Sequence, residues 1–188
     1  MGGSMQFDNA RPDMVRAVNQ RWLLKFWTQN LAGQRVPQWQ NLDVDRLLGF
    51  QESLSFLDVV RDANGGMRFL IRFHGETIRR AYASPDGPGR YLDEIVSAAT
   101  CSTGLAPYEK AACDGLPIYT ILQVSDRQGR KVNAERLLLP FGRDGETADR
   151  ILAAFEFICD DGAFDSDALL QFTDAPTIRL SAQIEARP

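Results

Sequence analysis

A run of alternating side chains near the middle of the chain constrains the fold more than any other feature. From Met67 to His74, strongly apolar residues alternate with a less apolar set, which is the period of a β-strand. A second alternating run, Leu54–Arg61, comes before it. The two are separated by Asp62–Gly66, whose Asn-Gly-Gly accommodates positive φ angles with little strain. The sequence therefore predicts an antiparallel hairpin, closed by Gly75, where a backbone without Cβ can turn sharply.

After this hairpin the pattern changes to short helices and then returns to strands. The predicted helices are Glu76–Ala83, Tyr91–Ala99 and Leu105–Asp114, and the predicted strands are Pro117–Asp126, Lys131–Phe141 and Arg150–Cys159. Strands on both sides of grouped helices are typical of an α+β fold. We expect the two terminal hairpins to meet in one five-stranded antiparallel sheet with the helices on one face. The stretch Ile178–Ile184 is either a further strand or a frayed tail.

An amphipathic helix is predicted ahead of the sheet, from Asp8 to Leu31. Its apolar side chains recur at helical spacing and form a broad aromatic stripe. Two interpretations stay open: the stripe packs on the chain's own sheet, or part of it serves a second subunit, since exposed aromatic faces tend to mark interfaces. The second interpretation makes the protein a homodimer, with an interface formed by Val15, Val18, Trp22 and Phe26.

The composition excludes several classes of protein. The 188 residues are 44% hydrophobic and 24% charged, with a formal net charge of −4. This is ordinary for a globular protein that buries its own core, and the acidic balance argues against a general nucleic-acid binder. No apolar run approaches the roughly 20 residues that span a bilayer, so no membrane insertion is expected. The N-terminus lacks a basic region followed by an apolar core, so we expect a cytoplasmic protein.

The cysteines and the segment composition suggest a simple organisation. The sequence has no CxxC pair and no Cys/His quartet, so no metal site is expected. The three cysteines, Cys101, Cys113 and Cys159, are expected to be reduced thiols. We expect three segments. Residues 1–33 hold an expression-tag remnant and the flanking helix, 34–160 form the domain, and 161–188 are a C-terminal extension.

The order of elements resembles that of a PAS domain. More narrowly, the chain is similar to a family of stand-alone alphaproteobacterial PAS-like proteins. The resemblance lies in the order and spacing of Trp27 and the segments Gly33–Pro37, Leu42–Leu48, Leu54–Val60, Phe69–Ile78, Gly89–Ile95 and Glu135–Phe157. It implies a five-stranded antiparallel sheet and a sensory or regulatory role through ligand or partner binding. The sequence contains no kinase, cyclase or helix-turn-helix segment, so an unknown signalling partner protein is expected to receive the signal.

Neither haem nor flavin is expected as a cofactor. Some PAS domains bind haem through a helix histidine, but the corresponding segment, Gly89–Ala99, has none, and His74 lies at a strand end. Flavin-binding relatives place a cysteine in an Asn-Cys-Arg setting, whereas Cys101 lies in Ala-Thr-Cys-Ser-Thr.

No enzymatic activity is expected either. Ser102 and Ser125 lack the Gly-x-Ser-x-Gly turn of a hydrolase. A pair of Cys101 or Cys113 with His74 stays open, although nothing in their spacing favours it.

A ligand site is predicted where the second strand runs into the first short helix. A small, mostly apolar molecule would lie near Phe73, Ile78, Tyr82 and Tyr91, with polar anchoring by Arg72, His74 and Arg79. The alternative is a filled core, which would leave a non-sensing adaptor that acts through protein–protein contacts.

Overall fold

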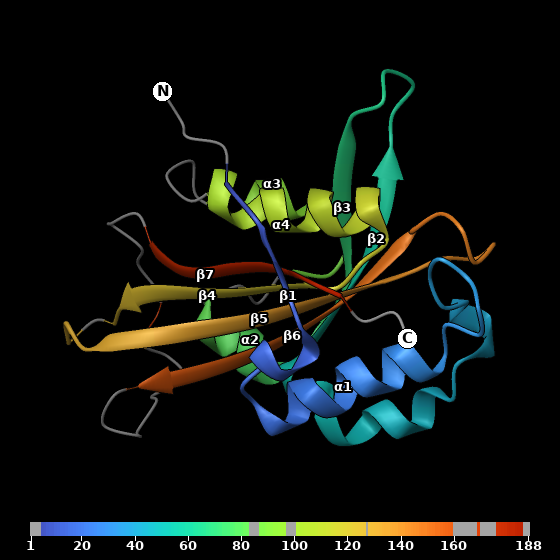
Figure 1. Cartoon of the computed structure of the whole chain (residues 1–188). Coiled ribbons are helices and arrows are strands. Elements are labelled where there is room, and N and C mark those ends of the chain that lie inside the picture. The colour runs from blue at the N-terminus through green and yellow to red at the C-terminus, as the bar shows by residue number, and fades with distance from the viewer. Residues whose placement is uncertain are drawn as a thin grey trace.

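A twisted sheet forms the middle layer of the molecule, and helices cover both of its faces (Figure 1). The computed structural model describes residues 5–82, 87–96, 101–126, 128–159, 169 and 176–185. Its helices, with 3-10 helices written η, are η1 (Pro12–Met14), α1 (Val18–Gln29), η2 (Trp39–Asn41), η3 (Val44–Ser53), α2 (Glu76–Ala81), α3 (Leu92–Ile95) and α4 (Cys101–Asp114). Its strands are β1 (Asp8–Ala10), β2 (Leu54–Arg61), β3 (Met67–His74), β4 (Ile118–Ser125), β5 (Lys131–Phe141), β6 (Arg150–Cys159) and β7 (Thr177–Ile184).

The strands that the sequence predicted are present and pair as expected. In the described residues the sheet has seven strands in the order β1-β7-β4-β5-β6-β2-β3. Antiparallel pairing joins β2 to β3, β4 to β5, and β5 to β6. β2 also pairs with β6, from Leu54 opposite Ala154 to Asp58 opposite Arg150, so the two hairpin groups meet in one sheet.

The prediction of a five-stranded, wholly antiparallel sheet is wrong at one edge. β7 pairs antiparallel with β4, and β1 pairs parallel with β7, which makes the sheet mixed. Without β7, the N–H and C=O groups along the outer side of β4 would be unpaired. Ala182 and Ile184 of β7 are fully buried, so the core also holds this strand in place. Ile178–Ile184, for which the sequence allows a strand or a frayed tail, lies in β7.

Helices lie on both faces of the sheet, whereas the sequence predicted them on one. α1 and η3 pack against one face and share a core cluster with Leu137, Leu139 and Leu152. α3, α4 and Ile78 of α2 belong to a second cluster on the other face, which includes Leu138, Ile151 and Ala153. The reason is that β5 and β6 are apolar on both faces, since successive side chains of a strand point to opposite sides.

The N-terminal helix is shorter than predicted. The segment from Asp8 begins with β1, continues through η1, and becomes α-helical only at Val18. Asp8 to Ala10 pair with Ala182 to Ile184, so a tertiary contact overrides the local helical pattern. The helix is held to the sheet by Trp27, which is fully buried and donates its indole N–H to the carbonyl of Pro140 at 2.6 Å.

A β-bulge changes the faces of β3 near its end. Phe56 lies opposite Phe73 and Leu57 opposite Ile71, so Arg72 has no partner across the ladder. An extra residue of this kind shifts the alternation by one position. Phe73 is therefore 37% exposed, and His74 is buried at 7% exposure. The predicted faces of these two residues are exchanged.

Gly75 is required for close packing and not for an unusual turn. Its φ is −64°, which any residue can adopt. A Cβ at this position would lie 2.2 Å from the carbonyl oxygens of both Gln51 and Glu52. The glycine thus allows the end of η3 to rest directly on the start of α2.

The short helices between β3 and β4 differ from the predicted ranges. α2 ends at Ala81, before the predicted Ala83. Of the predicted helix Tyr91–Ala99, the structure describes α3, Leu92–Ile95, and residues 97–100 lie outside the described part. α4 starts earlier than predicted, at Cys101, and contains Pro107.

A buried arginine compensates for the proline in α4. Pro107 has no N–H, so the carbonyl of Thr103 lacks its usual intrahelical donor. Arg136, on the adjacent strand β5 and only 8% exposed, donates to the carbonyls of Thr103 and Gly104 at 3.3 and 3.2 Å. Its guanidinium also lies 5.1 Å from the ring centre of Tyr108. This contact fixes α4 to the sheet.

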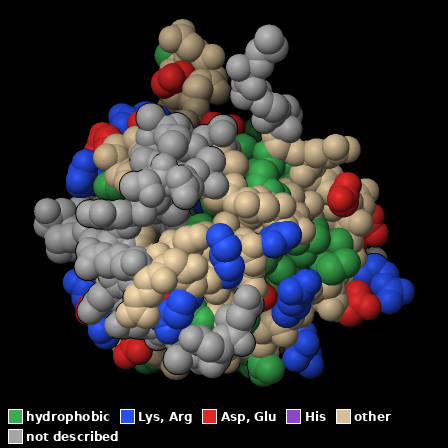
Figure 2. Space-filling model, turned by 90° about the vertical axis from the view of Figure 1, so that its left-hand side faces the viewer, with side chains coloured by type: hydrophobic (Ala, Val, Ile, Leu, Met, Phe, Trp, Pro, Cys, Tyr) green, Lys and Arg blue, Asp and Glu red, His purple; other side chains and the backbone are tan. Residues whose placement is uncertain are grey.

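The surface mixes charged and uncharged side chains. Figure 2 shows several Lys and Arg side chains over the middle of one face, with hydrophobic side chains beside them. None of the helices in the described part of the chain combines the length and the apolar character that crossing a membrane requires.

Candidate functional site

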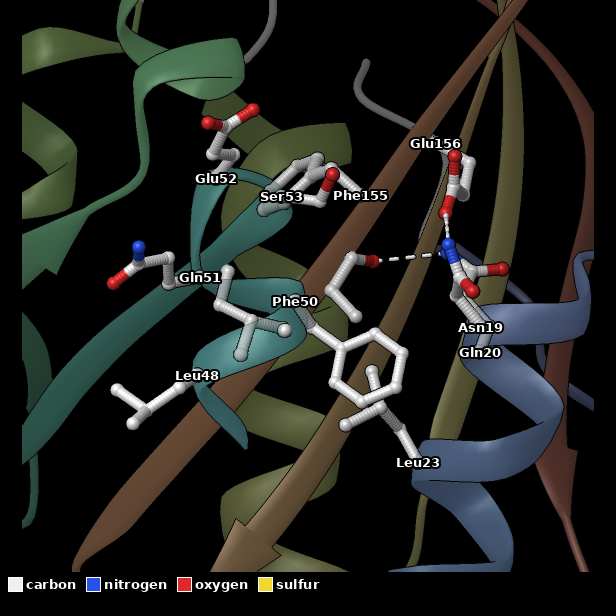
Figure 3. A pocket seen from close by; sticks show the side chains of 13 residues that line it. Asn19, Gln20, Leu23, Leu48, Phe50, Gln51, Glu52, Ser53, Phe155 and Glu156 are labelled. Carbon is white, nitrogen blue, oxygen red and sulfur yellow. Dashed lines mark hydrogen bonds between the residues drawn. The ribbon is translucent and has the colours of Figure 1, made fainter. Parts of the chain in front are cut away.

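A cavity of about 200 Å³ lies between α1, η3 and β6 (Figure 3). Its lining residues come from the first half of α1, the end of η3 and the middle of β6: Asn19, Gln20, Leu23, Leu48, Gly49, Phe50, Gln51, Glu52, Ser53, Leu54, Ala154, Phe155 and Glu156. A second described cavity is a wider and more open depression near the C-terminal end of α1, so the smaller and less open one is the better candidate for a ligand.

The residues of η3 and β6 explain why a cavity remains beneath α1. Phe50 stacks on Trp22 with ring centres 4.8 Å apart, so η3 leans on α1. Leu47 anchors η3 in the core and is only 4% exposed. Beneath the contact, β6 contributes Ala154, whose small side chain does not fill the gap between the two helices and the sheet.

A buried glutamine forms part of the cavity wall. Gln20 is 1% exposed and donates from Nε2 to the carbonyl oxygens of Glu135 and Ala154 at 3.2 and 3.0 Å. These two acceptors fix the orientation of the amide, because the carbonyl end cannot replace the NH₂ group there. Its Oε1 is left buried and without a hydrogen-bond donor among the described residues. An unsatisfied buried acceptor is unfavourable by about 1–3 kcal/mol.

Two glutamates lie side by side next to this glutamine. Glu135 of β5 and Glu156 of β6 are direct partners across the ladder, so their side chains share the face that α1 covers. Glu135 is 2% exposed and accepts a hydrogen bond from the Tyr119 hydroxyl at 2.6 Å. Glu156 is half-buried and accepts from Asn19 Nδ2 at 3.2 Å.

The environment of the pair raises the pKa of Glu156. Burial raises the pKa of Glu156, and the negative charge of Glu135 raises it further, while the hydrogen bond from Asn19 acts in the opposite direction. The pKa of the Tyr119 hydroxyl is also raised, first by burial and then by its bond to Glu135. The cavity therefore adjoins a desolvated, acceptor-rich region under the start of α1.

The seven residues of the ligand site predicted from the sequence have varied surroundings, and a ligand among them stays a prediction. None of the seven lines either of the described cavities. Ile78 is core, Arg72 binds Asp58, Arg79 pairs with Glu76, and Phe73 lies at the surface. Tyr82 packs edge-on against Phe155 and Phe157, and Tyr91 lies under the guanidinium of Arg68.

His74 has a structural environment. Its Nδ1 lies 2.6 Å from the hydroxyl of Ser55, which is fully buried and also bonds the carbonyl of Phe73. Gly87 packs against the ring, where a Cβ would lie 2.4 Å from His74 Cδ2. Burial lowers the pKa of His74 to about 4, and the charge of Arg79 adds to this. A hydroxyl with no exposed surface cannot reach a substrate, so the pair is suited to packing.

The predicted interface residues of the N-terminal helix lie mainly inside the chain. Val15 and Phe26 are buried in the core cluster beneath α1. Trp22 is partly buried and stacks on Phe26 with ring centres 5.5 Å apart. Val18 alone of the four is widely exposed, at 70%. The aromatic stripe packs on the chain's own sheet, and association through α1 stays a prediction.

The sequence analysis did not identify the residues around the cavity. A signal was present, because Glu156 interrupts the apolar run from Ile151 to Cys159, and charged residues are seldom buried without a partner. The proximity of Glu135 and Glu156 to Gln20 depends on strand register and helix placement, which no local pattern contains.

No protein-family model matches the chain, and no curated protein matches it. Among the described residues, no group of three or more His, Cys, Asp or Glu side chains is arranged to hold a metal ion.

Proposed function

We propose that this protein is a PAS-like regulatory module that senses a small ligand in the cavity beneath α1. The observation that carries the proposal is the cavity itself, where one buried acceptor without a donor, Gln20 Oε1, lies beside the apolar side chains of Leu23, Phe50 and Leu54. Pockets of this composition are typical of small-molecule sites. The meeting of the two hairpin groups in one sheet supports the PAS-like character that the sequence resemblance implies.

The position of the cavity suggests how occupancy would be transmitted. Leu23 and Phe50 line it, and Phe50 also stacks on Trp22 of α1. A ligand that binds one arrangement of α1 and η3 better than another shifts the population between them. The exposed side of α1, which includes Val18, would then present this change to a partner protein, to a second copy of the chain, or to both.

Native mass spectrometry of freshly purified protein tests the proposal. We expect a mass that exceeds the chain or its dimer by one small molecule per chain. Ala154→Leu should abolish this extra mass, since the added side chain occupies the cavity, and it should leave the melting temperature unchanged or raised.

Ala153→Leu is the matched control. Ala153 is fully buried on the opposite face of β6, where the same added volume overpacks a filled core by about 1–3 kcal/mol. This variant should melt lower than the wild type and retain the bound molecule. If no molecule is bound and no compound stabilises the protein, the adaptor with a filled core becomes the better function.

A further inference from the structure

The charged side chains of the cavity wall are carboxylates. Among its thirteen described lining residues are two glutamates, Glu52 and Glu156, and there is no Lys, Arg or His. Gln20 adds a buried Oε1 without a donor. The amide groups of Asn19 and Gln20 donate to Glu156 and to the carbonyl of Ala154 (Figure 3), whereas Gln51 and Ser53 add groups that can donate as well as accept. A ligand that enters here meets negative charge and lone pairs.

The neighbouring glutamate pair adds negative potential. Like charges directly opposite each other on paired strands are destabilising, and Glu135 and Glu156 have this arrangement. Glu135 accepts a hydrogen bond from the Tyr119 hydroxyl, whereas Glu156 accepts one from an amide N–H of the exposed Asn19. The N-terminal N–H groups of α1 offset part of this charge. A cationic group beside Glu156 would offset the rest and could donate to Gln20 Oε1.

The rest of the cavity limits the size and shape of such a ligand. Leu23, Phe50 and Leu54 provide an apolar wall, and an aromatic ring can also face a cation. A cavity of about 150 Å³ in another protein holds benzene, so roughly 200 Å³ suits a molecule of about six to ten non-hydrogen atoms. A ligand that matches both the carboxylate and the apolar wall is an ammonium group on a short hydrocarbon chain.

We propose that the ligand of this cavity is a small primary ammonium compound, held by Glu156 and the carbonyl oxygen of Gln20 with its hydrocarbon part against Leu23 and Phe50. This inference rests on the proposed function, because it names the ligand class of the same cavity. It assigns Glu156 the role of the charge that selects cations, and Gln20 the role of a directional acceptor.

The test is isothermal titration calorimetry with three probes of similar size on the full chain. The probes are n-pentylamine, 1-pentanol and pentanoate at neutral pH. We expect n-pentylamine to bind at least tenfold more tightly than either of the others, because a charge-assisted hydrogen bond in a partly buried site is stronger than a neutral one. Ammonium and sodium chloride serve as controls for general ionic effects.

Glu156→Gln and Glu109→Gln separate a local charge from net charge. Both remove one negative charge, but Glu109 lies exposed on α4, on the opposite face of the sheet. Glu156→Gln should weaken n-pentylamine binding by about tenfold or more and leave 1-pentanol unchanged, whereas Glu109→Gln should change neither. Circular dichroism and melting temperature report whether each variant is folded.

The outcomes distinguish this inference from the proposed function. Equal or tighter binding of 1-pentanol or pentanoate, lost in Ala154→Leu, would overturn the ammonium class and leave a ligand-binding module. No binding of any probe, together with no bound molecule in the native mass, would overturn both. The probe series on the wild-type protein decides the class even where a variant fails to fold.

Discussion

At the scale of single residues, Gly75 shows how a glycine can be required by its neighbours. A Cβ at this position would overlap the backbone oxygens of Gln51 and Glu52, and backbone atoms cannot move aside as a flexible side chain can. We expect Gly75→Ala to lower the free energy of unfolding by about 1–3 kcal/mol, as overpacking does. Urea denaturation followed by circular dichroism measures this.

Gly49 provides the comparison for that experiment. A Cβ added to Gly49 meets no atom within 4 Å, and its φ lies outside the positive region. Gly49→Ala should therefore change stability by less than about 1 kcal/mol. Equal losses in the two variants would show that the close approach at Gly75 does not limit stability.

His74 makes stability depend on pH. Its pKa is lowered to about 4 by burial and by the charge of Arg79, whereas an unfolded chain has a histidine pKa near 6.5. Above pH 6.5 the histidine is neutral in the folded and the unfolded chain, so protonation does not reduce the free energy of unfolding. Between pH 6.5 and 4 only the unfolded chain takes up the proton, so stability falls by about 3 kcal/mol.

The measurement is the free energy of unfolding at several pH values for the wild type and His74→Asn. The asparagine does not titrate, so the difference between the two proteins isolates the histidine from the carboxylates. The advantage of the wild type should shrink as the pH falls. A difference that stays constant from pH 7 to pH 4 would contradict the buried, neutral His74.

At the scale of elements, the attachment of α4 to the sheet couples Pro107 with Arg136. Pro107→Ala restores the N–H that the Thr103 carbonyl lacks, so the helix then depends less on the arginine. Arg136→Met should destabilise the wild type more than it destabilises Pro107→Ala, with a coupling of about 1 kcal/mol. Chemical denaturation of the four proteins in this double-mutant cycle measures the coupling, and strictly additive effects would count against the compensation.

At the scale of the whole molecule, β7 covers the outer side of β4 and joins β1 to the sheet. A chain that ends after residue 176 would lose the outer partner of β4 and the buried side chains of Ala182 and Ile184. We expect this truncation to lower the melting temperature by about 10 °C or more, since each kcal/mol shifts it by several degrees at this size. It should also promote self-association, because a free strand edge pairs with other chains.

A chain that ends after Glu185 is the control for the truncation, because it keeps all of β7. Thermal denaturation and size-exclusion chromatography should not distinguish it from the complete chain. Similar behaviour of the two truncations would mean that β7 is dispensable.

The sequence by itself determined five of the described strands, β2 to β6, and their order along the chain. Periodicity reports burial locally, so β2, β3 and the three strands from Ile118 to Cys159 could be located from their own residues. The same reasoning located the helical segments between the strands. It failed at Phe73 and His74, because the bulge opposite Leu57 exchanges their faces and lies in the pairing of two strands.

Only the tertiary structure decided the strands beyond β4 and the candidate site. β7 is a strand because β4 offers it unpaired backbone groups, and α1 starts late because β1 pairs with β7. The hydrogen bond from Gln20 to the Glu135 carbonyl joins residues 115 positions apart. Local periodicity shows which side of a segment is buried, but partner, register and distance between segments are properties of the assembled sheet. The cavity beneath α1 therefore depends on how α1, η3 and β6 pack together, which no single segment of the sequence specifies.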